Sequence, residues 1–268
     1  MSNINLIDFQ LPFTYLDERT KALLEGRLIE DFIGEDGHII KCDKLSYIGQ
    51  GVNSSVWKYE KDGKVYAFKT FFEEHYDYAL KYDVYRKMKN LPLKNITKAE
   101  EAYKKMSSKD SEMIDAYLMK YLSIDENFSI LEYPLDFLLE SLSNLEEDID
   151  ILSNNHIFMR DIKPANSVVN NEDNMFYITD VDMFTYNSKY PLETFLRQNK
   201  IRLISLVKLL FLQEVKGLTE IDSDKRLKLQ FLLNNYYSID SLKEGSITVG
   251  VSDMFKSYEK PKQYFLDR

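Results

Sequence analysis

Four polar residues near the middle of the 268-residue chain have the types and spacing that phosphoryl transfer requires. Asp161, Lys163 and Asn166 fall within one short loop, and Asp180 follows the strand-like segment 174–179. In this chemistry one carboxylate orients the attacking hydroxyl and a cation lies beside the transferred phosphate, while an amide and a second carboxylate hold magnesium. We therefore expect Asp161 and Lys163 at the reacting groups. Asn166 and Asp180 are the expected Mg²⁺ ligands.

The same residues carry a family resemblance. The run 160–166, Arg-Asp-Ile-Lys-Pro-Ala-Asn, closely resembles the catalytic loop of serine/threonine protein kinases, and Asp180 resembles the metal-binding aspartate of their Asp-Phe-Gly motif. The resemblance implies an α+β class and a bilobal protein-kinase-like fold. Its N-lobe would be β-rich with one main helix, and its C-lobe reduced and mainly helical. The resemblance also implies ATP and Mg²⁺ as cofactors and a hydroxyl-bearing acceptor on protein.

A glycine turn between two strand-like runs lies upstream of this loop. The turn leads from strand into strand, so it does not fit a dinucleotide-binding turn, which leads from strand into helix. Asp62-Gly63, between the next two β-branched and aromatic runs, predicts a tight hairpin. This order resembles the nucleotide-covering loop of the kinase small lobe. The residues that the resemblance implies for ATP binding here are Gly49, Gly51, Ser54, Val56, Ala67 and Lys69.

Lys69 follows Ala67-Phe68 and matches the lysine that bridges the α- and β-phosphates of ATP in kinases. Kinases pair this lysine with a glutamate on the next helix, which the apolar spacing here predicts over 73–90. Asp83 stands at the corresponding place and is one methylene shorter. A solvated acid on a charged helix face is the alternative interpretation of Asp83.

A third segment resembles the fifth strand of the small lobe and the hinge after it. It is the apolar run 116–122. The resemblance implies that Met119 lies at the back of the adenine pocket. It also implies that the backbone carbonyl of Lys120 and the backbone amide of Leu122 bond the adenine edge. A buried strand without a binding role is the alternative interpretation.

Composition narrows the classes of partner. A net charge of -9 and a pI of about 5.1 make nucleic acid and anionic membrane surfaces unsuitable partners. Cys42 is the single cysteine, which fits a reducing compartment. The N-terminal residues do not resemble a signal peptide, and no apolar run reaches the ~18 residues of a membrane span. We therefore expect a soluble, cytoplasmic protein.

The expected organisation has three parts. Residues 1–43 form an N-terminal extension of unknown role, 44–121 the N-lobe and 122–268 the C-lobe. A further strand is expected at 99–104. The helices expected in the C-lobe are 135–155, 201–215 and 222–237, on the spacing of their apolar residues.

Besides Ser54, which stands where kinases have their third glycine, and the shorter Asp83, the chain departs from the kinase pattern at three points. Met159 replaces the catalytic-loop histidine, Asp182 replaces the glycine of Asp-Phe-Gly, and no Ala-Pro-Glu follows. Because the segment after Asp182 is short, we expect an activity that does not depend on its phosphorylation. Arg160 should then hold the loop through backbone carbonyls or Asp182.

Three functions stay open from the sequence. They are an active protein-kinase-like phosphotransferase, a kinase-like small-molecule phosphotransferase, and a nucleotide-binding pseudokinase that acts as a binding module. Retention of all five expected catalytic and metal-binding side chains favours an active enzyme. Lys163 favours a serine/threonine acceptor on protein, whereas the missing Ala-Pro-Glu favours a smaller acceptor.

Overall fold

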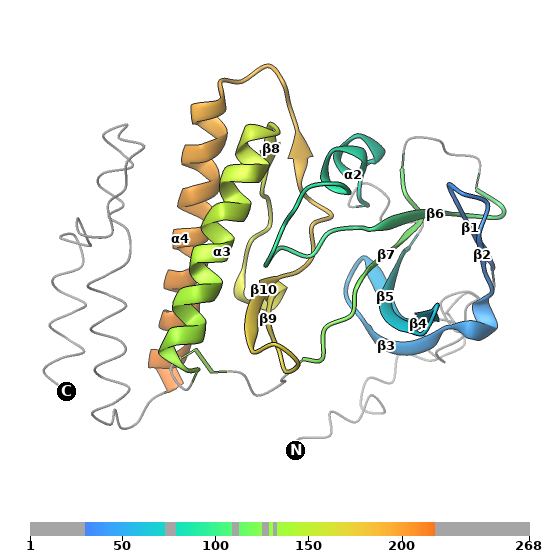
Figure 1. Cartoon of the computed structure of the whole chain (residues 1–268), viewed down its shortest axis with the longest axis horizontal. Coiled ribbons are helices and arrows are strands. Elements are labelled where there is room, and N and C mark those ends of the chain that lie inside the picture. Colours follow the sequence, from blue (N-terminus) through green and yellow to red (C-terminus); the bar gives the residue numbers. More distant parts are fainter. Residues whose placement is uncertain (1–29, 73–78, 109–112, 125–128, 131–132, 218–268) are drawn as a thin grey trace, which may run out of the picture. The chain divides into compact units, whose positions relative to one another are not determined.

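The computed structural model describes residues 30–72, 79–108, 113–124, 129–130 and 133–217 (Figure 1). Within these residues the protein is α+β, with a curled antiparallel sheet and three helices. The expectations for the N-terminal residues 1–29 and for a helix over 222–237 lie outside the described residues. So does the first part of the helix expected over 73–90.

The chain divides into two units, each built from two separate stretches. Unit 1 comprises Met1–Ala79 and Glu100–Tyr121, and unit 2 comprises Leu80–Ala99 and Leu122–Arg268. The chain therefore leaves unit 1 after Ala79, returns to it at Glu100, and leaves it again after Tyr121.

Unit 1 contains a sheet that has seven strands in its described residues, in the order β2-β1-β6-β7-β5-β4-β3. Every neighbouring pair is antiparallel. The strands are β1 (Phe32–Gly34), β2 (Ile39–Ile40), β3 (Ser46–Gln50), β4 (Ser54–Lys61), β5 (Lys64–Phe71), β6 (Glu101–Lys105) and β7 (Ala116–Lys120). β1 and β2 lie within residues 1–43, which the sequence predicts to be an N-terminal extension, and both are strands of this sheet.

The hairpin expected at Asp62-Gly63 is confirmed. β4 and β5 pair along their whole length, from Ser54 opposite Phe71 to Lys61 opposite Lys64. Asp62 and Gly63 have φ values of 51° and 73°, so both turn residues are left-handed. Two left-handed residues match the right-handed twist of the flanking strands, which is why Asp-Gly favours this turn. The strands expected at 99–104 and 116–122 are also confirmed, as β6 and β7.

The core of unit 1 lies against one face of this sheet. Trp57, Phe68 and Leu118 are cross-strand neighbours on β4, β5 and β7, and none is exposed. Tyr103 on β6 joins them, with its ring centroid 5.4 Å from that of Phe68 in an edge-to-face contact. The indole N–H of Trp57 donates to the Thr70 hydroxyl at 3.1 Å, so its polar atom is satisfied within the core.

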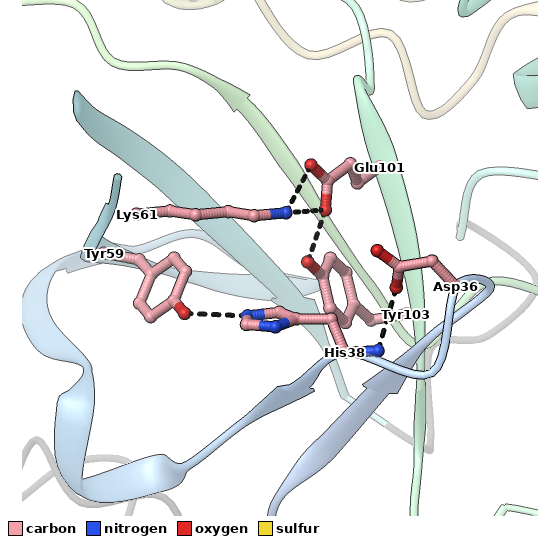
Figure 2. Close-up of polar contacts among 6 residues, drawn as sticks. All are labelled: Asp36, His38, Tyr59, Lys61, Glu101 and Tyr103. Carbon is pink, nitrogen blue, oxygen red and sulfur yellow. Dashed lines mark hydrogen bonds and ion pairs between the residues drawn. The ribbon is translucent and has the colours of Figure 1, made fainter. Parts of the chain in front are cut away.

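A polar network ties β6 to β4 at the border of this core (Figure 2). The Lys61 ammonium donates to both carboxylate oxygens of Glu101, at 2.7 and 2.8 Å, and the Tyr103 hydroxyl donates to Glu101 at 2.6 Å. The His38 ring nitrogen Nε2 and the Tyr59 hydroxyl lie 3.0 Å apart. Burial, with the Glu101 carboxylate, raises the pKa of Tyr103, so its hydroxyl stays a donor. The network thus stabilises the sheet.

Unit 2 contains the three α-helices of the described residues. The long helices α3 (Leu135–Asn154) and α4 (Leu192–Gly217) pack side by side (Figure 1). The helix expected over 135–155 is confirmed, and the one expected over 201–215 begins earlier, directly after Pro191. The third helix, α2 (Tyr82–Met88), is shorter than expected because residues 79–81 are not helical. None of the described helices is long and apolar enough to cross a membrane.

Two short hairpin-like sheets complete unit 2. β8 (Ile157–Phe158) pairs with β11 (Thr185–Tyr186), and β9 (Ser167–Asn170) pairs with β10 (Met175–Ile178). β10 confirms the strand expected at 174–179. Both pairs flank the loop that carries the candidate catalytic residues, so they fix the two ends of that loop.

A buried carboxylate attaches the segment 94–97 to the body of unit 2. Asp148 on α3 is fully buried and accepts hydrogen bonds from the backbone N–H groups of Lys94, Asn95 and Ile96, at 2.7, 2.7 and 2.9 Å. Burial raises the pKa of Asp148, and the three N–H donors oppose that rise because they favour the ionised form. Thr97 continues the attachment, since its N–H donates to the carbonyl of Ile178 at 2.9 Å.

Candidate functional site

The candidate catalytic loop of unit 2 is a compact, internally bonded structure. The Lys163 ammonium lies 2.6 Å from the Asp161 carboxylate, and the side-chain N–H₂ of Asn166 donates to the Asp161 carbonyl at 2.8 Å. A longer bond of 3.4 Å joins the same amide to the Asp161 carboxylate. The structure therefore brings these three predicted residues together.

The preceding residue, Thr179, places Asp180 beside this loop. The backbone N–H and the hydroxyl of Thr179 both bond the backbone carbonyl of Asn166, at 2.8 and 3.2 Å. This contact holds the end of β10 against the loop, so Asp180 leaves the strand beside Asn166. The two predicted metal ligands thus lie on neighbouring backbone segments, although they are far apart in sequence.

Asp161 and Asp180 also share an uncommon backbone conformation. Their φ values are 56° and 62°, in the left-handed region. The other non-glycine residues with positive φ in the described chain are Asp62, His156 and Asn174, which lie at two hairpin turns and at the end of α3. Such conformations concentrate at functional sites when no simple turn requires them. Both left-handed residues outside simple turns are residues that the sequence predicts to be functional.

A residue that sequence reasoning missed, Asn199 on α4, positions the start of the loop. Its side-chain oxygen accepts a bond from the backbone N–H of Met159 at 2.9 Å, and its N–H₂ donates to the carbonyl of Ile157 at 2.9 Å. The same N–H₂ donates to the Ser153 hydroxyl at 3.1 Å. Asn199 is fully buried. No local sequence signal indicates this role, because the bonded backbone groups lie 40 and 42 residues away in the chain.

Met159 and Arg160 differ in their surroundings. Met159, at the place of the kinase histidine, is fully buried and so packs in the core of unit 2. Arg160 is exposed, and within the described residues it forms no hydrogen bond or ion pair. The expected bonds from Arg160 to loop carbonyls or Asp182 are therefore not formed. Asp182 is itself buried at 8 % exposure.

In unit 1, strand register gathers the predicted nucleotide-binding residues on one face of the sheet. Val56 on β4 lies opposite Lys69 on β5, and Ala67 on β5 lies opposite Met119 on β7. Cross-strand partners and residues two apart point to the same side of a sheet. These four side chains therefore share the face opposite Trp57 and Phe68. Lys69 lies on this face with an exposure of only 5 %.

The two glycines before β4 are not required by the fold. Gly49 lies opposite Val56, and the N–H of Gly51 donates to the carbonyl of Ser54 at 2.8 Å. Neither glycine has a positive φ, and a Cβ atom at either would meet no described atom within 4 Å. Their lack of a side chain allows another group to approach the backbone closely at these two positions. Ser54 itself is buried.

The remaining predicted residues keep their assigned roles as predictions. Asp83 lies in the first turn of α2, in unit 2, where its carboxylate accepts a bond from the N–H of Val84 at 2.8 Å. Lys69 belongs to unit 1, and the pairing of Asp83 with Lys69 is untested. Lys120 is the last residue of β7, and Leu122 is buried and begins the second stretch of unit 2.

The side chains of Asn166 and Asp180 offer oxygen atoms of the kind that magnesium binds. Within the described chain, no group of three or more His, Cys, Asp or Glu side chains forms a metal cage. Mg²⁺ needs few protein ligands, since it binds one or two protein oxygens together with phosphate and water oxygens. An amide oxygen of Asn166 and the carboxylate of Asp180 are hard oxygen ligands of that kind.

Comparison with models of known protein families found no match, and comparison with curated protein sequences found none either.

Proposed function

We propose that the protein is an ATP- and Mg²⁺-dependent phosphotransferase of the protein-kinase type, which transfers the γ-phosphoryl group of ATP to a hydroxyl group. One observation carries this function: the bond between Thr179 and Asn166, which brings Asp180 to the loop of Asp161 and Lys163. The residues to which we assign the acceptor hydroxyl, the transferred phosphoryl group and the metal are thereby close together in unit 2. Phosphoryl transfer depends on this combination of positioning and charge.

Each residue of the loop has a distinct role in this proposal. Asp161 accepts a hydrogen bond from the acceptor hydroxyl and orients its oxygen toward the γ-phosphorus. Lys163, which lies 2.6 Å from the Asp161 carboxylate, supplies positive charge to the transferred phosphoryl group. Asn166 and Asp180 would hold Mg²⁺, which neutralises charge on the phosphates when it is bound.

Unit 1 supplies the residues that we assign to the nucleotide. Lys69 would bond the α- and β-phosphates, and the open backbone at Gly49 and Gly51 would cover them. Val56, Ala67 and Met119 share the face of Lys69, and they would contact the adenine ring. A bilobal kinase-like fold, with unit 1 as N-lobe and unit 2 as C-lobe, is part of this proposal. A hydroxyl on protein is the proposed acceptor because Lys163 is retained.

The test is transfer from γ-labelled ATP by the wild type and by Asp180→Asn. Asparagine tolerates the left-handed backbone at φ 62°, whereas alanine at this position would be strained. Asp180→Asn removes one charge from the metal site, so transfer should fall at least a hundredfold, about 2.7 kcal/mol. Asp62→Asn makes the same change at a left-handed turn residue outside the site, with φ 51°, and should keep wild-type activity.

The acceptors in this assay are the chain itself, a generic acceptor protein, and small alcohols including choline and an aminoglycoside. Label on protein supports the proposed function. Label on small molecules alone would move the acceptor to the small-molecule class. Binding of ATP without transfer to any acceptor would show a pseudokinase, and activity of Asp180→Asn within tenfold of wild type would contradict the assigned metal site.

A further inference from the structure

A cavity of about 440 Å³ lies in unit 2, between the start of α4 and the β8–β11 pair. Nine residues line it, and none of them is acidic. Its volume falls in the range of ~300–1,000 Å³ that small-molecule sites occupy. The chain as a whole has a net charge of -9, whereas the charged residues that line this cavity are all basic.

Two arginines line this cavity from different elements. Arg160 follows β8, and Arg202 comes from α4. Neither guanidinium is paired with a carboxylate within the described residues, and the buried Nε of Arg202 has no hydrogen-bond partner there. Burial lowers the pKa of Arg202, and the positive charge of Arg160 lowers it further. Two like charges are thus held together without a described counterion, and an anion in the cavity would relieve both costs.

Neutral hydrogen-bonding groups accompany the arginines. The neutral residues Gln198 and Thr194 lie four and eight residues before Arg202 on α4, so all three lie along one side of the helix. Thr185 and Asn187 line the cavity from β11 and the residue after it. Hydroxyl and amide groups at such positions can donate to several oxygens of one bound group.

Aromatic rings form the other part of the lining. Phe158 and Tyr190 contact each other edge to face, with ring centroids 6.3 Å apart. Phe158 also stacks on Phe195 at 4.1 Å, which supports its ring from behind. Tyr186 lines the cavity too, and the Lys87 ammonium lies 4.9 Å from its ring centroid. In a ligand with an anionic end and a flat apolar body, the anionic end could bind the arginines and the flat body could pack against the aromatic rings.

We propose that this cavity binds a small phosphate ester with an aromatic or other flat apolar body, with its phosphate between Arg160 and Arg202. A guanidinium binds phosphate through two parallel hydrogen bonds, and a phosphate near two negative charges balances both arginines. A carboxylate would balance only one. The site stands on the geometry of unit 2 alone, so it does not depend on the proposed transferase activity.

A phosphate group in this cavity could come from either of two sources. One is a free phosphate ester, to which we assign the site. The other is a phosphate carried by Thr185 or Thr194, whose side chains line the cavity. An experiment must therefore use protein whose phosphorylation state is known, which intact-mass measurement before and after phosphatase treatment provides.

The probes are phenyl phosphate, inorganic phosphate and phenol, titrated by calorimetry into the whole, unphosphorylated chain. We expect phenyl phosphate to bind more tightly than inorganic phosphate, and phenol not to bind. Arg202→Met keeps the aliphatic stem and removes the charge, so it should weaken phenyl phosphate binding at least tenfold. Lys200→Met removes the same charge from the same helix outside the cavity, and should bind like the wild type.

The opposite results would overturn the site. These are no binding of phenyl phosphate to the wild type, or equal affinity for the wild type and Arg202→Met when both have cooperative thermal unfolding. If Arg202→Met does not fold, Gln198→Glu replaces it, since a carboxylate in the cavity should repel the probe to a similar extent. Purified protein that carries phosphate on Thr185 or Thr194, and binds the probe only after its removal, would assign the cavity to the covalent source instead.

Discussion

At the scale of single residues, two lysines of unit 1 offer a matched comparison. Lys58 and Lys69 lie on adjacent strands and point to the same face of the sheet, because Lys58 pairs with Ala67, two residues before Lys69. Lys69 is 5 % exposed, whereas Lys58 is exposed, with its ammonium 5.8 Å from the ring centroid of Tyr121. The two lysines therefore share a face of the sheet and differ in solvent exposure.

We predict that Lys69→Met lowers kcat/KM for ATP by a hundredfold or more, because it removes the charge assigned to the phosphates. Lys58→Met should change it less than threefold. Steady-state kinetics with varied ATP measure both values, and the methionine keeps the aliphatic stem of each lysine. Equal losses in the two variants would remove the basis for assigning Lys69 to the nucleotide.

A second residue-scale contrast concerns Asn199, which acts through the backbone and not on a substrate. Asn199→Ala would leave the buried N–H of Met159 and the carbonyl of Ile157 without their described partner. An unsatisfied buried group costs about 1–3 kcal/mol, so unfolding in urea should show a loss of about 2–4 kcal/mol. Gln198→Ala, at the exposed neighbouring residue, should change the unfolding free energy by less than about 0.5 kcal/mol. A loss below 1 kcal/mol for Asn199→Ala would show that water replaces the amide.

At the scale of elements, the contact between α3 and α4 contains a titrating acid. Burial raises the pKa of Glu146 on α3 to about 7, against the attraction of Lys200 on α4. The folded state therefore holds the proton more tightly than the unfolded state, whose carboxyl has an ordinary pKa of 4.5. The resulting stability is complete below pH 4.5 and is lost as the pH rises through about 7.

We expect Glu146→Gln to remove this pH dependence, because glutamine does not titrate. Urea unfolding of both proteins at pH values from 5 to 8 measures the difference. The wild type should lose stability relative to Glu146→Gln as the pH rises, with most of the change complete by about pH 7.5. Parallel stability curves for the two proteins would show that Glu146 is solvated in the folded state.

Elements differ in how far the sequence predicts them. β4, β5 and β7 follow from β-branched and aromatic residues with a clear turn signal, and α3 follows from apolar residues at helical spacing. β1 and β2 have three and two residues, too few to show an alternation. The start of α2 at Tyr82 was also missed, because apolar Ala79 and Leu80 continue the helical spacing although the backbone there is not helical.

In the candidate site, too, the sequence predicts some features and not others. Its loop residues are close in sequence, and their types alone predict the chemistry. The role of Asn199 depends on partners 40 and 42 residues away, and the pairing of Arg160 with Arg202 in one cavity depends on how α4 packs. Local sequence contains no signal for such distant contacts, so only the folded chain shows them.

At the scale of the whole molecule, Asp148 secures the stretch that interrupts unit 1. Asp148→Asn would replace one of two accepting oxygens by an N–H₂ group that faces backbone N–H donors. We predict a loss of about 3 kcal/mol in the free energy of unfolding, measured in urea. Asp150→Asn, two residues further along α3, removes a longer contact of 3.9 Å to Lys200 at a side chain that is 56 % exposed. That variant should lose less than about 1 kcal/mol.

Equal losses from Asp148→Asn and Asp150→Asn would show that the backbone of residues 94–96 finds other acceptors. A selective loss in Asp148→Asn would identify this carboxylate as the main attachment of the interrupting stretch to unit 2.

The alternation of the chain between its units has a consequence for synthesis on the ribosome. All strands of the unit 1 sheet have been translated once residue 120 is added. Residues 94–96 emerge earlier, yet the carboxylate that binds them is encoded 52 to 54 residues further along. Until residue 148 is added, residues 94–96 of the nascent chain therefore lack the carboxylate that binds them in the folded protein. Because each unit consists of two separate stretches of the chain, no single cut in the gene separates the two units.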